Sequence, residues 1–295
     1  QIRRIWLDPA LSEVTIEADD PKSAVGQKGA NIQQLRNEIG WLVNVVRAPA
    51  RESRTQTDIR RFRKELADER KTLLRKFGTR IYRPQRPGPS WVRVTALGSY
   101  REVGRAMHLV TTNESKVLVD CGAKPTNNRS EVQPFFAAPE MLPLDNIDAV
   151  IITHAHVDHI GMLPVLFRYG YKGPVYCTQP TRDLMTLLQM DYIKVAQAEG
   201  NEAPYSKSDI QECIKHVVDV NWGEKTDIAP DIKMTMENAG HILGSSSVYM
   251  QIGEGRTEHK LLFSGDIKYE KSWLFDAATV RFNKVDTLVI ESTYG

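Results

Sequence analysis

Three histidines and an aspartate stand within six residues in the middle of the chain. They are His154, His156, Asp158 and His159, in the pattern H-x-H-x-D-H. Imidazole nitrogens suit zinc, and carboxylate oxygens suit zinc or a harder ion. Because neighbouring side chains in a turn point apart, His154 and His156 can converge on one ion while Asp158 and His159 reach a second. The alternative, a polar loop with chance histidines, is weakened by the completeness of the string.

Four apolar segments each end in a residue that can bind metal or move protons. The four residues are Asp120, His154, Asp266 and Glu291, after the segments 118–119, 151–152, 262–263 and 289–290. Strand ends are rigid and open to solvent, so functional groups gather there. His241 follows a glycine in a predicted loop. Each of these residues alone would be structural, but their joint placement predicts a single site.

Length, composition and charge indicate what kind of protein this is. The chain has 295 residues, which suggests roughly two domains of ~100–200 residues. The hydrophobic share of 41% is ample for buried cores, and the formal net charge is only +2. Residues 1–90 nevertheless carry 19 Lys and Arg against 11 Asp and Glu. This asymmetry favours a part of the chain that faces nucleic acid.

The three cysteines indicate a reducing compartment. Cys121, Cys177 and Cys213 are widely spaced and form neither a C-x-x-C site nor a disulfide framework. Since no signal peptide is recognisable and no apolar run approaches ~18 residues, we expect a soluble, cytoplasmic protein. We also expect both ends of the chain to be cuts in a longer protein.

The first fifty residues have the plan strand, short helix, G-x-x-G, helix, strand. The loop is Gly26, Gln27, Lys28 and Gly29. Two glycines let a nucleic-acid backbone approach closely, the following helix N-terminus favours phosphate, and Lys28 adds a cation. A tight corner that needs glycine for steric reasons is the alternative. The plan resembles a KH domain, a module that clamps about four nucleotides of single strand.

A basic segment follows and leads to the second half of the chain. Spacing of apolar residues over 57–77 predicts one amphipathic helix, whose basic clusters we interpret mainly as a solvated face. Residues 83–89 form a proline-rich linker. We therefore predict a KH-like domain over 1–50, a basic helix and linker over 51–89, and a catalytic domain over 90–295.

The second half reads as alternating strands and helices, an α/β pattern. Strands are predicted over 91–97, 107–112, 116–120, 148–153, 174–178, 232–237, 247–252, 260–263 and 286–290. Helices are predicted over 158–169, 181–199 and 208–218.

The metal-type string and the strand-end residues together resemble the metallo-β-lactamase superfamily. The matching residues are the H-x-H-x-D-H string at His154, His156, Asp158 and His159, with Asp120, His241 and Asp266. The segment 291–295 is similar to the acidic motif that opens the β-CASP branch of nucleases. A KH segment before such a domain resembles archaeal cleavage-and-polyadenylation-specificity-factor-like ribonucleases.

The resemblance implies a fold, a cofactor and an activity. It implies a partial αββα catalytic fold that is cut where the β-CASP insert begins. Two zinc ions are expected, one held by His154, His156 and His241, the other by Asp158, His159 and a bridging Asp266. The implied reaction is hydrolysis of RNA phosphodiesters, as an endonuclease with 5′ exonuclease action left open, in 3′-end processing or transcription termination.

Further roles and partners come with the same resemblance. The resemblance implies that Asp120, Asp158 and Glu291 are catalytic residues. Asp120 would orient a ligand or the water, and Glu291 would support a histidine of the insert. That histidine and one later ligand have no counterpart here, so the fragment itself can be inactive. Single-stranded RNA is the expected partner and no membrane is involved. RNA polymerase, other processing proteins and a homodimer through a missing C-terminal part are left open.

Two alternative functions fit parts of the pattern. A hydrolase of the same fold could act on small thioester-type substrates, although such substrates need no nucleic-acid clamp. A metal-stabilised RNA-binding protein without catalysis is the other alternative, and an incomplete H-x-H-x-D-H string would have favoured it.

Overall fold

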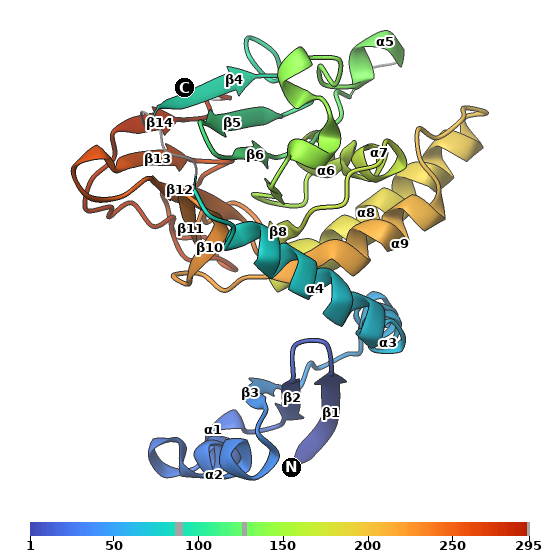
Figure 1. Cartoon of the computed structure of the whole chain (residues 1–295). Helices are drawn as coiled ribbons and strands as arrows, with labels where there is room; N and C mark the ends of the chain where they lie inside the picture. The colour runs from blue at the N-terminus through green and yellow to red at the C-terminus, as the bar shows by residue number, and fades with distance from the viewer. Residues whose placement is uncertain (86–90, 126–128, 294–295) are drawn as a thin grey trace. The chain divides into compact units, whose positions relative to one another are not determined.

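Two units of unequal size, Gln1–Lys76 and Phe77–Gly295, make up the chain. The computed structural model describes every residue except 86–90, 126–128 and 294–295 (Figure 1). The predicted proline-rich linker and the end of the predicted 291–295 motif thus fall partly outside the described residues. In the described part of the chain, no helix has the length and apolar character needed to cross a membrane.

The first unit contains a three-stranded sheet and helices that pack against it. Its elements are β1 (Ile2–Asp8), β2 (Glu13–Ala18), α1 (Pro21–Val25), η1 (Gln27–Gly29), α2 (Ala30–Ile39), β3 (Leu42–Arg47), α3 (Arg54–Glu65) and the start of α4 (Ala67–Ile81). The sheet order is β1-β2-β3, with β1 antiparallel and β3 parallel to β2. The core is formed by Val14, Ile16 and Val43, against which Ile32 and Leu35 of α2 pack.

The prediction of a single helix over 57–77 is wrong. The structure has two helices, α3 and α4, and Leu66 between them leaves the helical conformation. Asp68 and Glu69 lie in the first turn of α4. Acidic side chains are favoured at a helix N-terminus by the helix dipole, which gives this second start a physical reason. The hydrophobic spacing alone did not contain that information.

The second unit is built on two β-sheets. The six-stranded sheet contains β4 (Val92–Ala96), β5 (His108–Thr112), β6 (Lys116–Val119), β7 (Ala149–Ile151), β8 (Val175–Cys177) and β9 (Val217–Asp219), in that order. The five-stranded sheet contains β10 (Lys225–Ala229), β11 (Ile232–Asn238), β12 (Ser246–Ile252), β13 (His259–Phe263) and β14 (Thr287–Val289), again in that order. A continuous buried cluster lies between them, with Val117 and Ile151 from one sheet and Met234, Met250 and Leu261 from the other.

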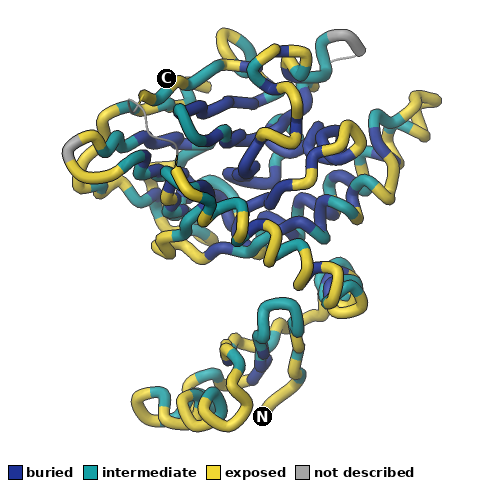
Figure 2. The backbone as a smooth tube through the Cα atoms, viewed as in Figure 1, coloured by how far each residue is buried: buried dark blue, intermediate teal, exposed yellow. Residues whose placement is uncertain are grey.

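Helices cover the outer face of the six-stranded sheet (Figure 1). The helices of this unit are α5 (Arg129–Val132), α6 (Val157–Ile160), α7 (Leu163–Arg168), α8 (Gln179–Ala198) and α9 (Lys207–His216), with short 3-10 helices η2 (Pro139–Met141), η3 (Leu144–Asn146) and η4 (Gly255–Thr257). Figure 2 shows the strands and the inner sides of these helices as the buried part of the unit. The mixed α/β class predicted from the sequence is confirmed, and the described residues form a helix–sheet–sheet layering.

Two further predictions need correction. The helix predicted over 158–169 is two short helices, α6 and α7, because Met162 between them adopts a non-helical conformation. The helix predicted over 208–218 ends at His216, and Val217 already belongs to β9. Strand β10 was not predicted at all.

Candidate metal centre

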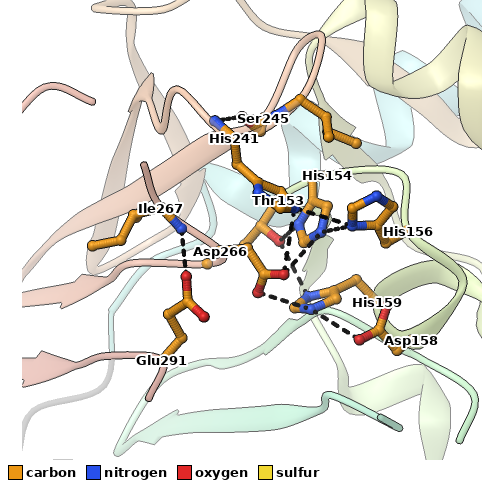
Figure 3. A network of polar contacts seen from close by, with 12 residues as sticks. Thr153, His154, His156, Asp158, His159, His241, Ser245, Asp266, Ile267 and Glu291 are labelled. Carbon is orange, nitrogen blue, oxygen red and sulfur yellow. Dashed lines mark hydrogen bonds and ion pairs between the residues drawn. The ribbon is translucent and has the colours of Figure 1, made fainter. Parts of the chain in front are cut away.

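The candidate site lies where four parallel-paired strands end. β6 and β7 are parallel neighbours in one sheet, and β13 and β14 are parallel neighbours in the other. Asp120 follows β6, His154 comes three residues after β7, Asp266 three residues after β13, and Glu291 two residues after β14. The two sheets therefore deliver the predicted residues to one end of the unit, where Figure 3 shows His154, Asp266 and Glu291.

Tight backbone packing sets the position of the histidine loops. Gly122 lies against the backbone of Asp158, and a Cβ there would collide with the Asp158 carbonyl oxygen. Gly240 has φ +69°, and a Cβ on it would lie 2.7 Å from the Lys268 carbonyl oxygen. Only glycine fits such positions at low cost. These two glycines therefore permit close backbone contacts beside Asp158 and His241.

Three imidazoles and one carboxylate converge on a single point. One ligand-type atom from each of His154, His156, His241 and Asp266 lies within 4.8 Å of all the others. His156 Nδ1 is 3.0 Å from His154 Nε2 and 3.1 Å from His241 Nε2. Tetrahedral zinc with nitrogen ligands at ~2.0–2.1 Å separates those nitrogens by about 3.3 Å. The donor set and its spacing thus fit a zinc ion.

Asp266 also faces a second group of donors. Its Oδ2 is 3.7 Å from His154 Nε2 and 3.5 Å from His241 Nε2, while its Oδ1 is 3.3 Å from His159 Nε2. Asp158 Oδ2 lies 3.8 Å from the same His159 nitrogen. The carboxylate of Asp266 therefore stands between two donor groups, and the second group consists of Asp158 and His159.

Asp120 and Thr153 form the support beneath these ligands. Asp120 accepts hydrogen bonds from the Thr153 backbone N at 2.8 Å and lies 2.8 Å from His159 Nδ1. The Thr153 hydroxyl contacts both Asp120 oxygens and lies 3.0 Å from His154 Nδ1. Asp120 itself has φ +61°, an uncommon conformation for a residue other than glycine. A carboxylate that fixes the ring of a ligand histidine is a recurrent feature of metal sites.

Glu291 belongs to neither donor group. Its Oε1 accepts a hydrogen bond from the Ile267 backbone N at 2.8 Å, and its own backbone N donates to the Ser264 hydroxyl. Glu291 thus fixes the strand end that carries Asp266.

Sequence reasoning missed Thr153 and Ser245. The Ser245 hydroxyl accepts from the backbone N of His241 at 3.1 Å. The position of Thr153 directly before His154 could have indicated its role in the site. Nothing in the sequence around Ser245 indicated such a role.

The histidines of the two donor groups have pKa values shifted in opposite directions. Burial and the neighbouring imidazoles hold the pKa of His154 well below its ordinary value. Burial also lowers the pKa of His241, although Asp266 partly offsets it. For His159, burial acts in the same direction, but Asp120 and Asp266 outweigh it and raise the pKa to about 10. His154 and His241 are thus neutral donors, and an ion at His159 would replace a proton.

The G-x-x-G loop of the first unit has the conformation that its glycines permit. Gly26 and Gly29 have φ of +76° and +81°, and Lys28 between them is exposed with φ +50°. A Cβ on Gly29 would meet nothing within 4 Å. Helix α2 begins at Ala30 without a side-chain cap and without an acidic residue in its first turn. Its N-terminal N–H groups are therefore not capped by a side chain.

Comparison with known proteins places this geometry in a family. A model described as "Metallo-beta-lactamase superfamily domain" matches residues 109–291, more than half of the chain. The transcription termination factor FttA of Methanosarcina mazei is 48% identical over 294 residues, which cover 100% of this chain and 46% of that protein. FttA of Methanothermobacter thermautotrophicus is 44% identical over 296 residues, with the same coverage.

The chain spans about half the length of these curated relatives. Among solved structures, Rm3 metallo-beta-lactamase is 18% identical, with a TM-score of 0.40 over 67% of this chain and 68% of that chain. The match over residues 109–291 includes the H-x-H-x-D-H string, Asp120, His241, Asp266 and Glu291. The chain belongs to the metallo-beta-lactamase superfamily.

Proposed function

We propose that the protein is a zinc-dependent nuclease that hydrolyses phosphodiester bonds of single-stranded RNA. The observation that carries the proposal is the position of Asp266, whose two oxygens face two groups of metal-type donors. His154, His156 and His241 would hold one ion, and Asp158 and His159 the other. Paired ions of this kind, when bound, lower the pKa of water and stabilise charge on attacking and leaving oxygens.

The chain's own residues would position the reaction. Asp120 accepts from His159 and Thr153, so it fixes the imidazole that faces Asp158 and Asp266. This arrangement keeps the Nε2 atom of His159 directed toward the site. Glu291 holds the backbone next to Asp266 in place through Ile267. Rigid support of this kind preserves the geometry on which such chemistry depends.

RNA is the substrate that the first unit favours. Its G-x-x-G loop offers an exposed Lys28 and the N-terminus of α2 to a phosphate. A cavity of about 390 Å³ lies in the same unit, lined by the apolar side chains of Ile2, Ile32 and Leu35 and by polar ones that include Asp20 and Asn31. Single-strand binders combine contacts to the backbone with surfaces for bases. A substrate as small as a thioester would need neither feature.

Relatives named transcription termination factors support a role in ending transcripts. In this proposal the protein cleaves nascent RNA, and RNA polymerase is a candidate partner. The KH-like assignment of residues 1–50 belongs to the same proposal.

His156→Ala and Asp158→Ala test the nuclease directly. Each removes one donor from a different group, so cleavage of a labelled RNA should fall at least about 100-fold while RNA binding stays within twofold. Asp191→Ala, an exposed residue of α8 outside both donor groups, is the control. Full cleavage by either donor variant would contradict the proposal, as would hydrolysis of a chromogenic thioester without any cleavage of RNA.

A further inference from the structure

A large cavity opens beside the metal-type donors of the second unit. Its volume is about 780 Å³, and Asp158, His159 and Asp266 line one part of it. The loop 99–104 lines another part, together with residues 288–293 at the end of β14. A polymer held by one group at the donors would therefore extend into a space that the loop 99–104 borders.

The loop 99–104 is fixed at two points. Just after it, the backbone N of Ala106 donates to the carbonyl oxygen of Asp158 at 2.8 Å. Within it, the Glu102 carboxylate accepts a hydrogen bond from Lys124 at 2.9 Å. The first of these bonds joins the end of the loop to the backbone of a donor. The loop backbone is therefore fixed relative to Asp158.

The backbone of this loop is strained. Ser99, Arg101 and Arg105 have φ values of +64°, +59° and +45°. Residues other than glycine rarely adopt this conformation, because it brings the Cβ close to the backbone. Strain of this kind gathers at binding and catalytic sites, where the surrounding structure enforces it. Its presence in the wall of a cavity beside metal-type donors indicates that side chains of the loop have a role there.

Arg101 is the charged side chain of the loop that has no partner. It is exposed, it lines the cavity, and it makes no hydrogen bond or ion pair with any described residue. Glu102 beside it is paired with Arg105 and Lys124. Among the described residues that line the cavity, Arg101 is also the one lysine or arginine, whereas several are carboxylates. An anionic polymer in this cavity would therefore meet one fixed cation of the protein, at Arg101.

We propose that Arg101 binds a phosphate of the substrate strand next to the phosphate held at the donors. A guanidinium group suits this task, because its fork of N–H donors matches phosphate oxygens and its positive charge is permanent. Contacts to phosphates set the register and orientation of a nucleic acid on a protein. A second anchored phosphate would fix the direction in which the strand crosses the donors. This assignment rests on the proposed function, because it takes a nucleic-acid strand as the occupant of the cavity.

A scan with neutral phosphate analogues tests this contact. A hydrolysis-resistant RNA octamer is titrated against the zinc-loaded protein, with one phosphate replaced by a methylphosphonate at each position in turn. Beside the position held at the donors, we expect one at which loss of the charge weakens binding about fivefold, as for a charge pair ~4 Å apart in water. Arg101→Gln should reduce the penalty at that position to less than about twofold. Arg101→Lys, which keeps the charge, should retain most of it.

A matched control separates this contact from the general effect of a lost surface charge. Arg281 is also exposed and has no ion-pair partner among the described residues, but it does not line the cavity. Arg281→Gln should therefore leave the position-specific penalty in place. For the unmodified octamer, Arg101→Gln should reduce the slope of log affinity against log salt concentration by about 0.7, the value for one phosphate contact on a single strand.

The outcomes distinguish this contact from the nuclease proposal. A penalty that Arg101→Gln abolishes, in a protein that cleaves no natural RNA, would support the contact and refute the nuclease. Cleavage of natural RNA together with a penalty that Arg101→Gln leaves unchanged would overturn the contact alone. An equal loss of affinity at every position of the octamer, or no loss at any position, would also overturn it.

Discussion

Thr153 connects three functional side chains of the site. Its hydroxyl lies 2.9 and 3.1 Å from the two Asp120 oxygens, 3.0 Å from His154 Nδ1 and 3.4 Å from His159 Nδ1. A hydroxyl has one proton to donate and two lone pairs to offer, so it links the carboxylate to one ring of each donor group. Thr153 is 1% exposed, which keeps water from taking over these bonds.

Thr153→Val removes the hydroxyl while it keeps the shape of the side chain. Loss of such a supporting bond typically weakens metal binding about 10- to 100-fold, and we expect zinc affinity to fall in that range. Competition with a chromogenic chelator measures it. Thr153→Ser, which retains the hydroxyl, is the control and should bind zinc nearly as well as the natural chain. Unchanged affinity in the valine variant would show that Thr153 does not support the ligands.

Gly29→Asp tests the phosphate contact of the first unit. Two like charges ~4 Å apart in water repel by about 1 kcal/mol, so RNA affinity should fall about fivefold. Gly29 has φ +81°, and Gly29→Asn is the matched control because asparagine tolerates this conformation and carries no charge. A filter-binding titration compares the two, and zinc content should be unchanged in both. Equal affinities would favour a purely steric role for the glycine.

At the scale of elements, ion pairs hold the loop 99–104 in place. Glu102 accepts from Arg105 at 3.1 Å and from Lys124 at 2.9 Å. The Arg105 guanidinium also donates to the backbone carbonyls of Glu131 and Gln133. These bonds tie the loop to the segment after β6. Hydrogen bonds from Arg105, partly opposed by burial, lower the pKa of Glu102 to about 2.

This pKa gives a signed prediction for stability. A carboxyl whose pKa is lower in the folded state than the ordinary 4.5 stabilises the fold above pH 4.5 and loses that effect as the pH falls toward 2. Glu102→Gln should therefore lower the free energy of unfolding by about 1 kcal/mol at pH 7, with less difference at pH 3. Urea unfolding at the two pH values measures it. A difference that does not shrink at low pH would contradict the ion-pair explanation.

Strand positions were largely readable from the sequence, and helix breaks were not. The apolar runs at 116–120, 232–237 and 260–263 correspond to β6, β11 and β13 within two residues at each end. β9 is three residues long and follows α9 without a turn residue, so local pattern could not separate it from the helix. Polar and apolar residues alternate only weakly in β10, so its sequence does not indicate a strand. The break at Leu66 has no glycine or proline beside it, the usual markers, whereas the break at Met162 lies between Gly161, the C-cap of α6, and Pro164 in the first turn of α7.

The site was predictable to the extent that its residues are chemically distinctive. The histidines and aspartates were identified because few structural roles need so many ligand types close together. Thr153 and Ser245 were missed because threonine and serine are common. Only the packing shows that these two residues contact His154 and His241.

For the whole molecule, the two units divide the proposed work. The first carries an exposed G-x-x-G loop and a basic excess, and the second carries the donor groups and the cavity. In our proposal, the first unit raises the local concentration of RNA and the second performs the chemistry. Linked sites gain from such an effective concentration even when each contact is modest.

The central claim is that Asp266 joins two ion sites, and zinc content per chain tests it most directly. Elemental analysis after exhaustive dialysis should find about two zinc ions per chain. Two ions would mean that Asp158, His159 and Asp266 hold the second ion alongside the histidine-rich group. One zinc ion or none per chain would contradict the account.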